Sequence, residues 1–382
     1  MQCKKLFEKI DELYEEYLDI WEDVCNIESP TEYKDGVDKV GQYFISLAKK
    51  YNWDIEVCEQ QFAGNVICIT LNPEIDESPI SVSGHIDTVH PVGFFGIPAV
   101  KRDSQKIYGP GVMDCKGGVV AATLAMDALS QCGFKKRPVE LLLQTDEEKG
   151  SALSNKKTIE YICSKAKDSI AFLNVECHKP NKVTLIRKGI LRYKFSIEGK
   201  AVHSASCNVG INAITEAAYK IIELEKLKNI DGITCNCGVI QGGTVPNTVA
   251  QMCEFTTDIR FLTQEELEFV KNRVKEIANN NKLEGAICYI EEMAYRPAMY
   301  ESERNIDLLK KINDIFKENE LPILTGVKSN GGSDASYITQ CGIPCIDSIG
   351  VEGQFAHSIN ENAYLLSLAQ SAKRIASIIY CI

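Results

Sequence analysis

The sequence lacks any long apolar run. No stretch approaches the roughly 18 consecutive apolar residues that a membrane-spanning helix requires. The first 25 residues, MQCKKLFEKIDELYEEYLDIWEDVC, have the spacing of an acidic amphipathic helix and do not resemble a signal peptide. We therefore expect no association with a membrane and a cytoplasmic location.

The sequence also has fewer basic than acidic residues and few closely spaced cysteines. Lys and Arg number 42 against 53 Asp and Glu, and the resulting net charge of −11 argues against a general nucleic-acid binder. The 16 cysteines are scattered singly, and the one tight pair, Cys235 and Cys237, lacks the spacing of a zinc knuckle or a redox motif. These features favour reduced, structural thiols.

The length of 382 residues exceeds one ordinary core and predicts two domains. Up to residue 187, strand-like runs such as NVICITL and PVELLLQTD alternate with helical segments, which predicts an α/β domain with a mostly parallel sheet. Residues 188–297 instead show half-buried strands and two helices in the ferredoxin-like α+β order. Residues 298–382 resume the first pattern, so we expect residues 188–297 to be an inserted domain.

Histidine is scarce, yet one of the five stands where a strand should end. In the segment SVSGHIDTVH, a β-branched apolar run leads directly into His85 and Asp87. Ligands gather at the carboxyl ends of strands in open α/β sheets, so other strand ends are informative. The further acidic and imidazole side chains expected at this edge are Asp114, Asp146, Glu147, Glu148, Glu176 and His357.

This set of side chains predicts a metal centre. One water-activating ion needs about three protein ligands, so two histidines with at least three carboxylates suit two ions better than one. Mixed nitrogen and oxygen donors favour zinc, with cobalt or manganese as alternatives. A single acidic residue at a strand end is usually solvated, so the prediction depends on the joint pattern.

Several motifs resemble those of one known family. SGHIDTV resembles its His-x-Asp-Thr-Val strand end, YGPGVMDCKGG its Gly-x-Gly-x-x-Asp-x-Lys-Gly-Gly loop, and QTDEEKGS its Asp-Glu-Glu-x-Gly-Ser turn; GGSDAS and FAHSINE follow in the family's order. The family comprises dinuclear zinc amidohydrolases and peptidases, including bacterial glutamate carboxypeptidase, acetylornithine deacetylase, succinyl-diaminopimelate desuccinylase, aminoacylase and peptidase T. The resemblance covers nearly the whole chain and implies a metallopeptidase catalytic domain with an inserted dimerisation or lid domain.

The resemblance assigns a metal-binding role to five residues. It implies that His85 and Glu176 hold one ion and that Glu148 and His357 hold the other. Asp114 would bridge both ions. The implied cofactor is therefore two divalent metal ions per chain.

The resemblance also implies roles for neighbouring residues. Glu147 would be the general base, and Asp87 would hold His85 in place, as metal-bound imidazoles generally require. The peptide bond between Asp114 and Cys115 would be cis, a costly conformation that active sites tolerate.

Four residues of the inserted segment match family motifs as well. GKAVHSA implies that His203 polarises the substrate carbonyl, in many family members across a dimer interface, so a homodimer is expected. QGGTVPNTV and TTDIRF imply that Asn247 and Arg260 bind substrate, and Arg296 in YRPAMY could recognise a second carboxylate. The family commonly has Asn before Pro, whereas here Pro246 precedes Asn247.

The resemblance implies metal-dependent hydrolysis of an amide bond in a small peptide or N-acyl amino acid. The likeness is closest to glutamate carboxypeptidase, from TDEEKGS, YRPAMY and GGSDASY. An N-acyl-amino-acid deacylase, such as acetylornithine deacetylase or the desuccinylase, is the main alternative, and an inactive binding protein on the same fold is a remote one. We expect Arg187 and Lys188 to be solvated charges, with contact to an acidic substrate as the alternative. We expect His90 and His178 to be loop residues without a role.

Overall fold

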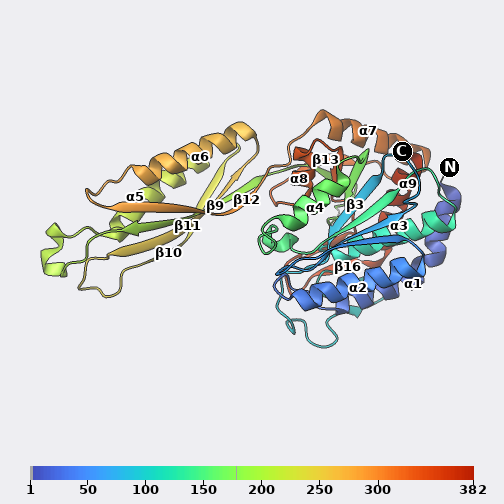
Figure 1. Cartoon of the computed structure of the whole chain (residues 1–382), viewed down its shortest axis with the longest axis horizontal. Coiled ribbons are helices and arrows are strands. Elements are labelled where there is room, and N and C mark those ends of the chain that lie inside the picture. The colour runs from blue at the N-terminus through green and yellow to red at the C-terminus, as the bar shows by residue number, and fades with distance from the viewer. Residues whose placement is uncertain (1–2, 178) are drawn as a thin grey trace. The chain divides into compact units, whose positions relative to one another are not determined.

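The computed structural model describes residues 3–177 and 179–382. It divides into two compact units. The first runs to Leu185 and resumes over residues 301–328 and 333–382, and the second comprises residues 186–300 and 329–332. The segment 329–332 was not predicted to belong with the insert. Figure 1 shows both units with their elements labelled.

The first unit contains seven helices among its described residues. They are α1 (Lys4–Asn26), α2 (Lys34–Lys50), α3 (Lys116–Gln131), α4 (Lys157–Ala166), α7 (Glu303–Glu318), α8 (Ala335–Gln340) and α9 (Leu365–Cys381). No helix of the described residues combines the length and the apolar character needed to cross a membrane.

The first unit is built around an eight-stranded sheet. Its strands, in spatial order, are β1 (Asp54–Cys58), β2 (Val66–Leu71), β6 (Val139–Gln144), β3 (Ile80–His85), β7 (Ala171–Asn174), β14 (Cys345–Asp347), β8 (Lys182–Arg187) and β13 (Thr325–Ser329). The central strands β6, β3, β7 and β14 run parallel, whereas β1, β2 and β8 pair antiparallel with their neighbours. A small second sheet contains β4 (Lys101–Arg102), β5 (Lys106–Tyr108), β15 (Gly353–Gln354) and β16 (Asn362–Tyr364).

Helices cover both faces of the large sheet, which explains why β2 and β3 are buried along their whole length. Helices α1, α3 and α9 pack together, and α4 packs with α8 on the other side of the sheet in Figure 1. Helix α3 has the sequence KGGVVAATLAMDALSQ and is buried on almost every side. A helix that is apolar all round must lie inside the domain, and α3 does so between α1, α9 and the sheet.

The second unit has the predicted ferredoxin-like order. Its elements are β9 (Gly189–Glu198), α5 (Ala213–Glu225), β10 (Thr234–Gly242), β11 (Met252–Phe261), α6 (Gln264–Asn279) and β12 (Ile287–Arg296). The four strands form an antiparallel sheet in the order β10-β11-β9-β12. Alternate residues of β9 and β11 are buried, and α5 and α6 lie on one face of the sheet in Figure 1.

The predicted fold class is thus confirmed. The large sheet is parallel at its centre, and a separate antiparallel α+β unit is inserted into the chain that forms it. Phe195 of β9 stacks on Phe255 of β11 with ring centroids 4.6 Å apart, within the apolar core of the second unit. Each unit therefore has a core of its own.

Candidate metal centre

Three neighbouring strands deliver donor side chains to one edge of the large sheet. Strand β3 lies between β6 and β7 and runs parallel to both. His85 is the last residue of β3. Glu147 and Glu148 open the short turn that follows β6, and Glu176 lies two residues beyond β7. Because the strands are parallel, these chain segments meet at the same edge.

Asp114 lies between two histidines. Its Oδ1 is 3.1 Å from Nε2 of His85, and its Oδ2 is 3.1 Å from Nε2 of His357. Nε2 of His357 is also 3.2 Å from Oε2 of Glu148, and Nε2 of His85 is 3.9 Å from Oε1 of Glu176. The structure therefore brings together all five side chains that the resemblance implied as metal ligands.

The electrostatics of this cluster favour a bound cation. Burial disfavours a charged His85, yet its hydrogen bonds to Asp114 and Asp87 raise its pKa well above the ordinary value. Hydrogen bonds to Asp114 and Glu148 raise the pKa of His357 to about 11. The carboxylates thus favour positive charge at this position, and divalent ions could supply that charge in place of protons. Two imidazoles among three carboxylates are a donor set that fits zinc, cobalt or manganese.

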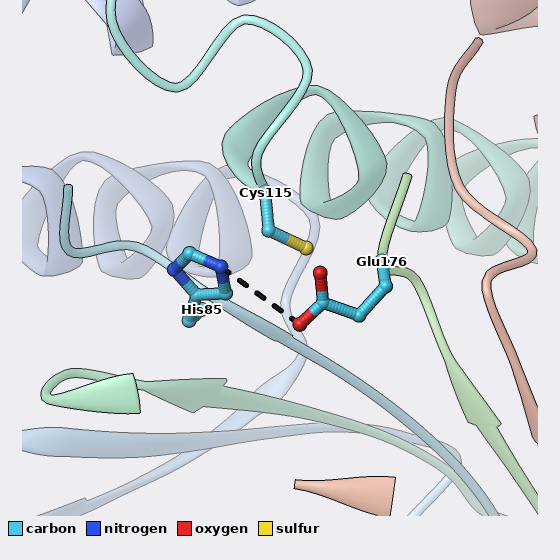
Figure 2. Close-up of side chains that lie close together, drawn as sticks. All are labelled: His85, Cys115 and Glu176. Carbon is cyan, nitrogen blue, oxygen red and sulfur yellow. Dashed lines mark ion pairs between the residues drawn. The ribbon is translucent and has the colours of Figure 1, made fainter. Parts of the chain in front are cut away.

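Cys115 is a further potential donor that the sequence analysis did not single out. The ligand atoms of His85, Cys115 and Glu176 all lie within 4.8 Å of one another, as do those of His85, Asp114 and Glu148. Figure 2 shows the first of these groups, with the sulfur of Cys115 beside the carboxylate of Glu176. The only signal in the sequence is that Cys115 directly follows Asp114.

Asp87 is buried and connects three segments around the ligands. Its carboxylate accepts hydrogen bonds from the backbone N–H groups of Glu147 and Glu148, at 3.2 and 3.1 Å, and from the hydroxyl of Thr31 at 2.8 Å. Nδ1 of His85 lies 3.0 Å from the Asp87 carbonyl oxygen and 3.4 Å from Oδ1. Asp87 thereby fixes the turn carrying both glutamates relative to His85.

Glu361 supports Asp114 from behind, a role that the sequence analysis missed. Its Oε1 accepts hydrogen bonds from the backbone N–H groups of Met113 and Asp114, at 3.0 and 3.1 Å. The side chain is only 2% exposed, and burial raises its pKa to about 7. Glu361 is the last letter of the FAHSINE motif, so its place in that motif was the available signal.

The N-terminus of α3 approaches β7 closely at Gly118. A Cβ at this position would lie 2.0 Å from the carbonyl oxygen of Val175, so no other residue fits without displacing the backbone. The absence of a side chain lets this end of α3 lie close enough for Cys115 to reach Glu176. The peptide bond between Asp114 and Cys115 is cis, as the resemblance implied.

The other four predicted site residues belong to the second unit. His203 is exposed, and its Nδ1 accepts a hydrogen bond from the N–H of Ala205 at 3.2 Å. The adjacent Ser204 donates its N–H to the carbonyl of Asn247 at 3.0 Å, which holds these two segments side by side. Arg260 of β11 and Arg296 of β12 both pair with Ile190 of β9, one on each side.

Three residues have a different exposure or different partners from those that the sequence predicted. Arg187 and Lys188 were expected to be solvated, but each is only 8% exposed, and Nη1 of Arg187 donates to the carbonyls of residues 331 and 332. Asp146 accepts hydrogen bonds from the backbone N–H of Ser154 and from the hydroxyl of Thr158 in α4, instead of adding to the donor cluster. His90 stacks on Phe94, and His178 lies outside the described residues.

The sequence is similar to known peptidases over the part of the chain that contains this cluster. The family described as "Peptidase family M20/M25/M40" matches residues 82–380. Carboxypeptidase G2 from Pseudomonas sp. (strain RS-16) is 27% identical over 346 residues, which cover 88% of this chain and 82% of the relative. Succinyl-diaminopimelate desuccinylase from Rickettsia massiliae (strain Mtu5) is 23% identical and covers 90% of this chain and 94% of the relative.

Among solved structures, the fold resembles that of aminopeptidase PepT from Bacillus cereus ATCC 10987. The TM-score is 0.79 at 20% identity, with 96% of this chain and 98% of the other covered. The similarity extends over the whole fold, and the family match contains every donor of the cluster described above. The chain therefore belongs to peptidase family M20/M25/M40.

Proposed function

We propose that the protein is a dinuclear metal-dependent exopeptidase that releases a C-terminal amino acid from a small peptide or an N-acyl amino acid. As a member of its peptidase family, it is a hydrolase that acts on amide bonds. The observation that carries the proposal is the position of Asp114, whose two carboxylate oxygens each lie 3.1 Å from a different histidine. A carboxylate with one histidine on each oxygen is suited to bridging two ions.

In this proposal His85 and Glu176 hold one divalent ion, Glu148 and His357 hold the other, and Asp114 serves both. Bound ions of this kind polarise a carbonyl oxygen and make a water molecule acidic enough to act as a nucleophile near neutral pH. Zinc suits the mixed nitrogen and oxygen donors best, with cobalt and manganese as alternatives.

Glu147 is the proposed general base. Its backbone is anchored by Asp87, and its side chain is buried beside Glu148 at the edge where the ligands gather. Glu147 takes a proton from the attacking water while the oxygen of that water adds to the substrate carbonyl carbon. It then returns that proton to the amide nitrogen as the C–N bond breaks, so the products are a carboxylate and an amine.

His203 is proposed to stabilise the oxyanion that develops on the substrate carbonyl. Because Nδ1 of His203 accepts the Ala205 N–H, the ring proton of the neutral imidazole sits on Nε2. That nitrogen is therefore a donor, as an oxyanion partner must be.

Arg260, Arg296 and Asn247 are the proposed substrate-binding residues. A guanidinium presents a planar fork that suits a carboxylate, and Arg260 is held by Asp258 through Nε at 2.5 Å and Nη2 at 3.2 Å. Two arginines on strands flanking the same residue of β9 favour a substrate with two carboxylates. A C-terminal glutamate has this character.

The second unit also offers a surface for a homodimer, which we include in the proposal. Strand β10 is at the edge of its sheet, and Val239 and Ile240 on it are 55% and 50% exposed. Ile222 on the adjacent helix α5 is exposed too. An apolar edge strand can extend the sheet of a second copy through main-chain hydrogen bonds. All 16 cysteines are free thiols, which supports a reducing, cytoplasmic setting.

The second candidate function is deacylation of an N-acyl amino acid, which the similarity to the desuccinylase supports. The test is turnover of a panel of dipeptides ending in Glu, Asp or Leu, N-acetyl and N-succinyl amino acids, with zinc, cobalt or manganese added. Release of free glutamate from acyl-glutamate and dipeptide substrates is expected. Turnover restricted to N-succinyl or N-acetyl diamino acids would support the deacylase instead, and no turnover with fully bound metal would indicate an inactive binding protein.

A further inference from the structure

We propose that the thiolate of Cys115 is an additional ligand of the ion held by His85 and Glu176, and that it makes this position selective for thiophilic divalent cations. The inference rests on the metal centre of the proposed function. It goes beyond that function because the motif leaves the residue after Asp114 open, so the sulfur is this chain's own contribution.

The first argument is proximity. The ligand atoms of His85, Cys115 and Glu176 lie within 4.8 Å of one another, and all three residues are buried. In Figure 2 the sulfur points from the start of α3 toward the carboxylate of Glu176, and the imidazole ring of His85 lies on the other side of Cys115. Zinc binds nitrogen, oxygen and sulfur at about 2.0–2.3 Å, so a nitrogen, an oxygen and a sulfur ligand in a tetrahedral site lie about 3.3–3.5 Å apart. A small closure of the three side chains around one ion is enough to reach that spacing.

The second argument is that the sulfur is fixed relative to both other donors. Sγ of Cys115 donates to the carbonyl oxygen of Val175 at 3.1 Å, and Val175 directly precedes Glu176. On the other side, a Cβ built on Gly84 would lie 3.2 Å from Sγ, and Gly84 directly precedes His85. The thiol is therefore held between the two backbone segments that carry the ligands.

The third argument is chemical. Imidazole and carboxylate donors bind zinc, cobalt and manganese, whereas a thiolate favours zinc, cadmium and cobalt over manganese and magnesium. On binding, the thiol proton leaves to solvent, the hydrogen bond to Val175 is given up, and a metal–sulfur bond forms with no change in oxidation state. The alternative role for Cys115 is that of a buried thiol whose only task is the bond to Val175.

Cobalt spectroscopy distinguishes the two roles. Metal-free protein is titrated with Co²⁺ in the absence of added thiols, and the near-ultraviolet absorbance is recorded. We expect a sulfur-to-cobalt charge-transfer band in the wild type and in Cys68→Ser, a buried cysteine of strand β2 that is outside the donor groups. The band should be absent in Cys115→Ser and Cys115→Ala, with far-ultraviolet circular dichroism confirming that both variants are folded.

Metal selectivity gives a second readout that does not depend on activity. By equilibrium dialysis, Cys115→Ser should bind Cd²⁺ at least about tenfold more weakly, since loss of even an outer partner of a ligand costs that much, while its Mn²⁺ affinity stays unchanged. Equal cobalt bands in the wild type and both Cys115 variants, or equal losses of Cd²⁺ and Mn²⁺ affinity, would overturn the inference. Two bound ions without a sulfur band refute this inference alone, whereas failure of the wild type to bind any cobalt refutes the proposed metal centre as well.

Discussion

Glu147 and Glu148 are adjacent and chemically identical, but their side chains have different neighbours and different proposed roles. Oε2 of Glu148 lies 3.2 Å from Nε2 of His357, whereas the side chain of Glu147 is assigned to the reacting water. The backbone N–H groups of both residues are held by one carboxylate, that of Asp87. A single buried residue therefore positions both the proposed ligand Glu148 and the proposed base Glu147.

The first prediction concerns this pair. Glu147→Gln should lower turnover by about 10²- to 10⁴-fold while both ions stay bound, because a base contributes to rate and not to metal affinity. Glu148→Gln should instead lose metal and lose activity as a consequence. Metal content by atomic absorption and turnover are measured on the same samples. Near-wild-type turnover in Glu147→Gln, or metal loss confined to that variant, would reverse the two assignments.

The second prediction concerns Glu361. Glu361→Ala leaves the N–H groups of Met113 and Asp114 without their acceptor, so the loop carrying Asp114 should loosen. We expect metal affinity to fall by about 10- to 100-fold, as for other groups that hold a ligand in place. Competition with a chelator measures this loss. Glu361→Gln keeps one acceptor oxygen and should lose less, so equal losses in the two variants would argue against this role.

At the scale of elements, Lys116 ties the end of one helix to the start of another. It lies in the first turn of α3, is fully buried, and donates from Nζ to the carbonyl oxygens of Val24 and Ile27, at 3.3 and 2.7 Å. Val24 lies in the last turn of α1, and Ile27 follows its last residue. A cation at a helix C-terminus interacts favourably with the helix dipole and satisfies carbonyls that have no partner within the helix.

The third prediction follows from this contact. Lys116→Met keeps the aliphatic bulk but removes the donor, and should lower the free energy of unfolding of the first unit by about 1–3 kcal/mol. Urea denaturation followed by circular dichroism measures the change. Lys4→Met serves as the control, because the Lys4 side chain is 74% exposed at the other end of α1. If the two variants unfold at the same urea concentration, the Lys116 contact does not stabilise the junction of α1 and α3.

At the scale of the whole molecule, the fourth prediction is that the 42.5 kDa chain sediments as a dimer, at twice the mass of one chain. Val239→Lys on the edge strand β10 should convert the dimer to a monomer, because it places a charge in an apolar strand-to-strand interface. Tyr289→Lys on the opposite edge strand β12 is the matched control, since Tyr289 is equally exposed at 55%. A dimer that survives Val239→Lys and dissociates with Tyr289→Lys would move the interface to β12.

The fifth prediction concerns the subunit in which His203 acts. If His203 serves the partner's active site, mixing the inactive variants His203→Ala and Glu147→Gln should restore up to about a quarter of wild-type activity, because one site in each mixed dimer is then complete. The readout is turnover of the mixture after subunit exchange. Native mass spectrometry checks that mixed dimers have formed. If they have formed and activity stays at the level of the separate variants, His203 acts in the active site of its own subunit.

The sequence by itself predicted the fold class, which the structure confirms, and the side chains that are proposed here as metal donors. Period-two and helical patterns are local properties of the chain, so they predicted the parallel sheet and the ferredoxin-like order of β9 to β12. Because ligands follow the carboxyl ends of parallel strands, the chain positions of His85, Glu148 and Glu176 marked them as candidate donors. The resemblance to the family then singled them out from neighbours such as Asp146.

Only the tertiary structure decided which groups surround those donors. Cys115 and Glu361 become neighbours of the proposed metal centre through contacts with Val175 and with the loop before α3, and the motifs that contain or adjoin these two residues did not show those contacts. Arg187 was expected in solvent because charged residues usually lie there, yet the fold buries it against carbonyls of residues 331 and 332. Burial and long-range hydrogen bonds arise when distant segments pack together, so they belong to the folded molecule and not to its sequence pattern.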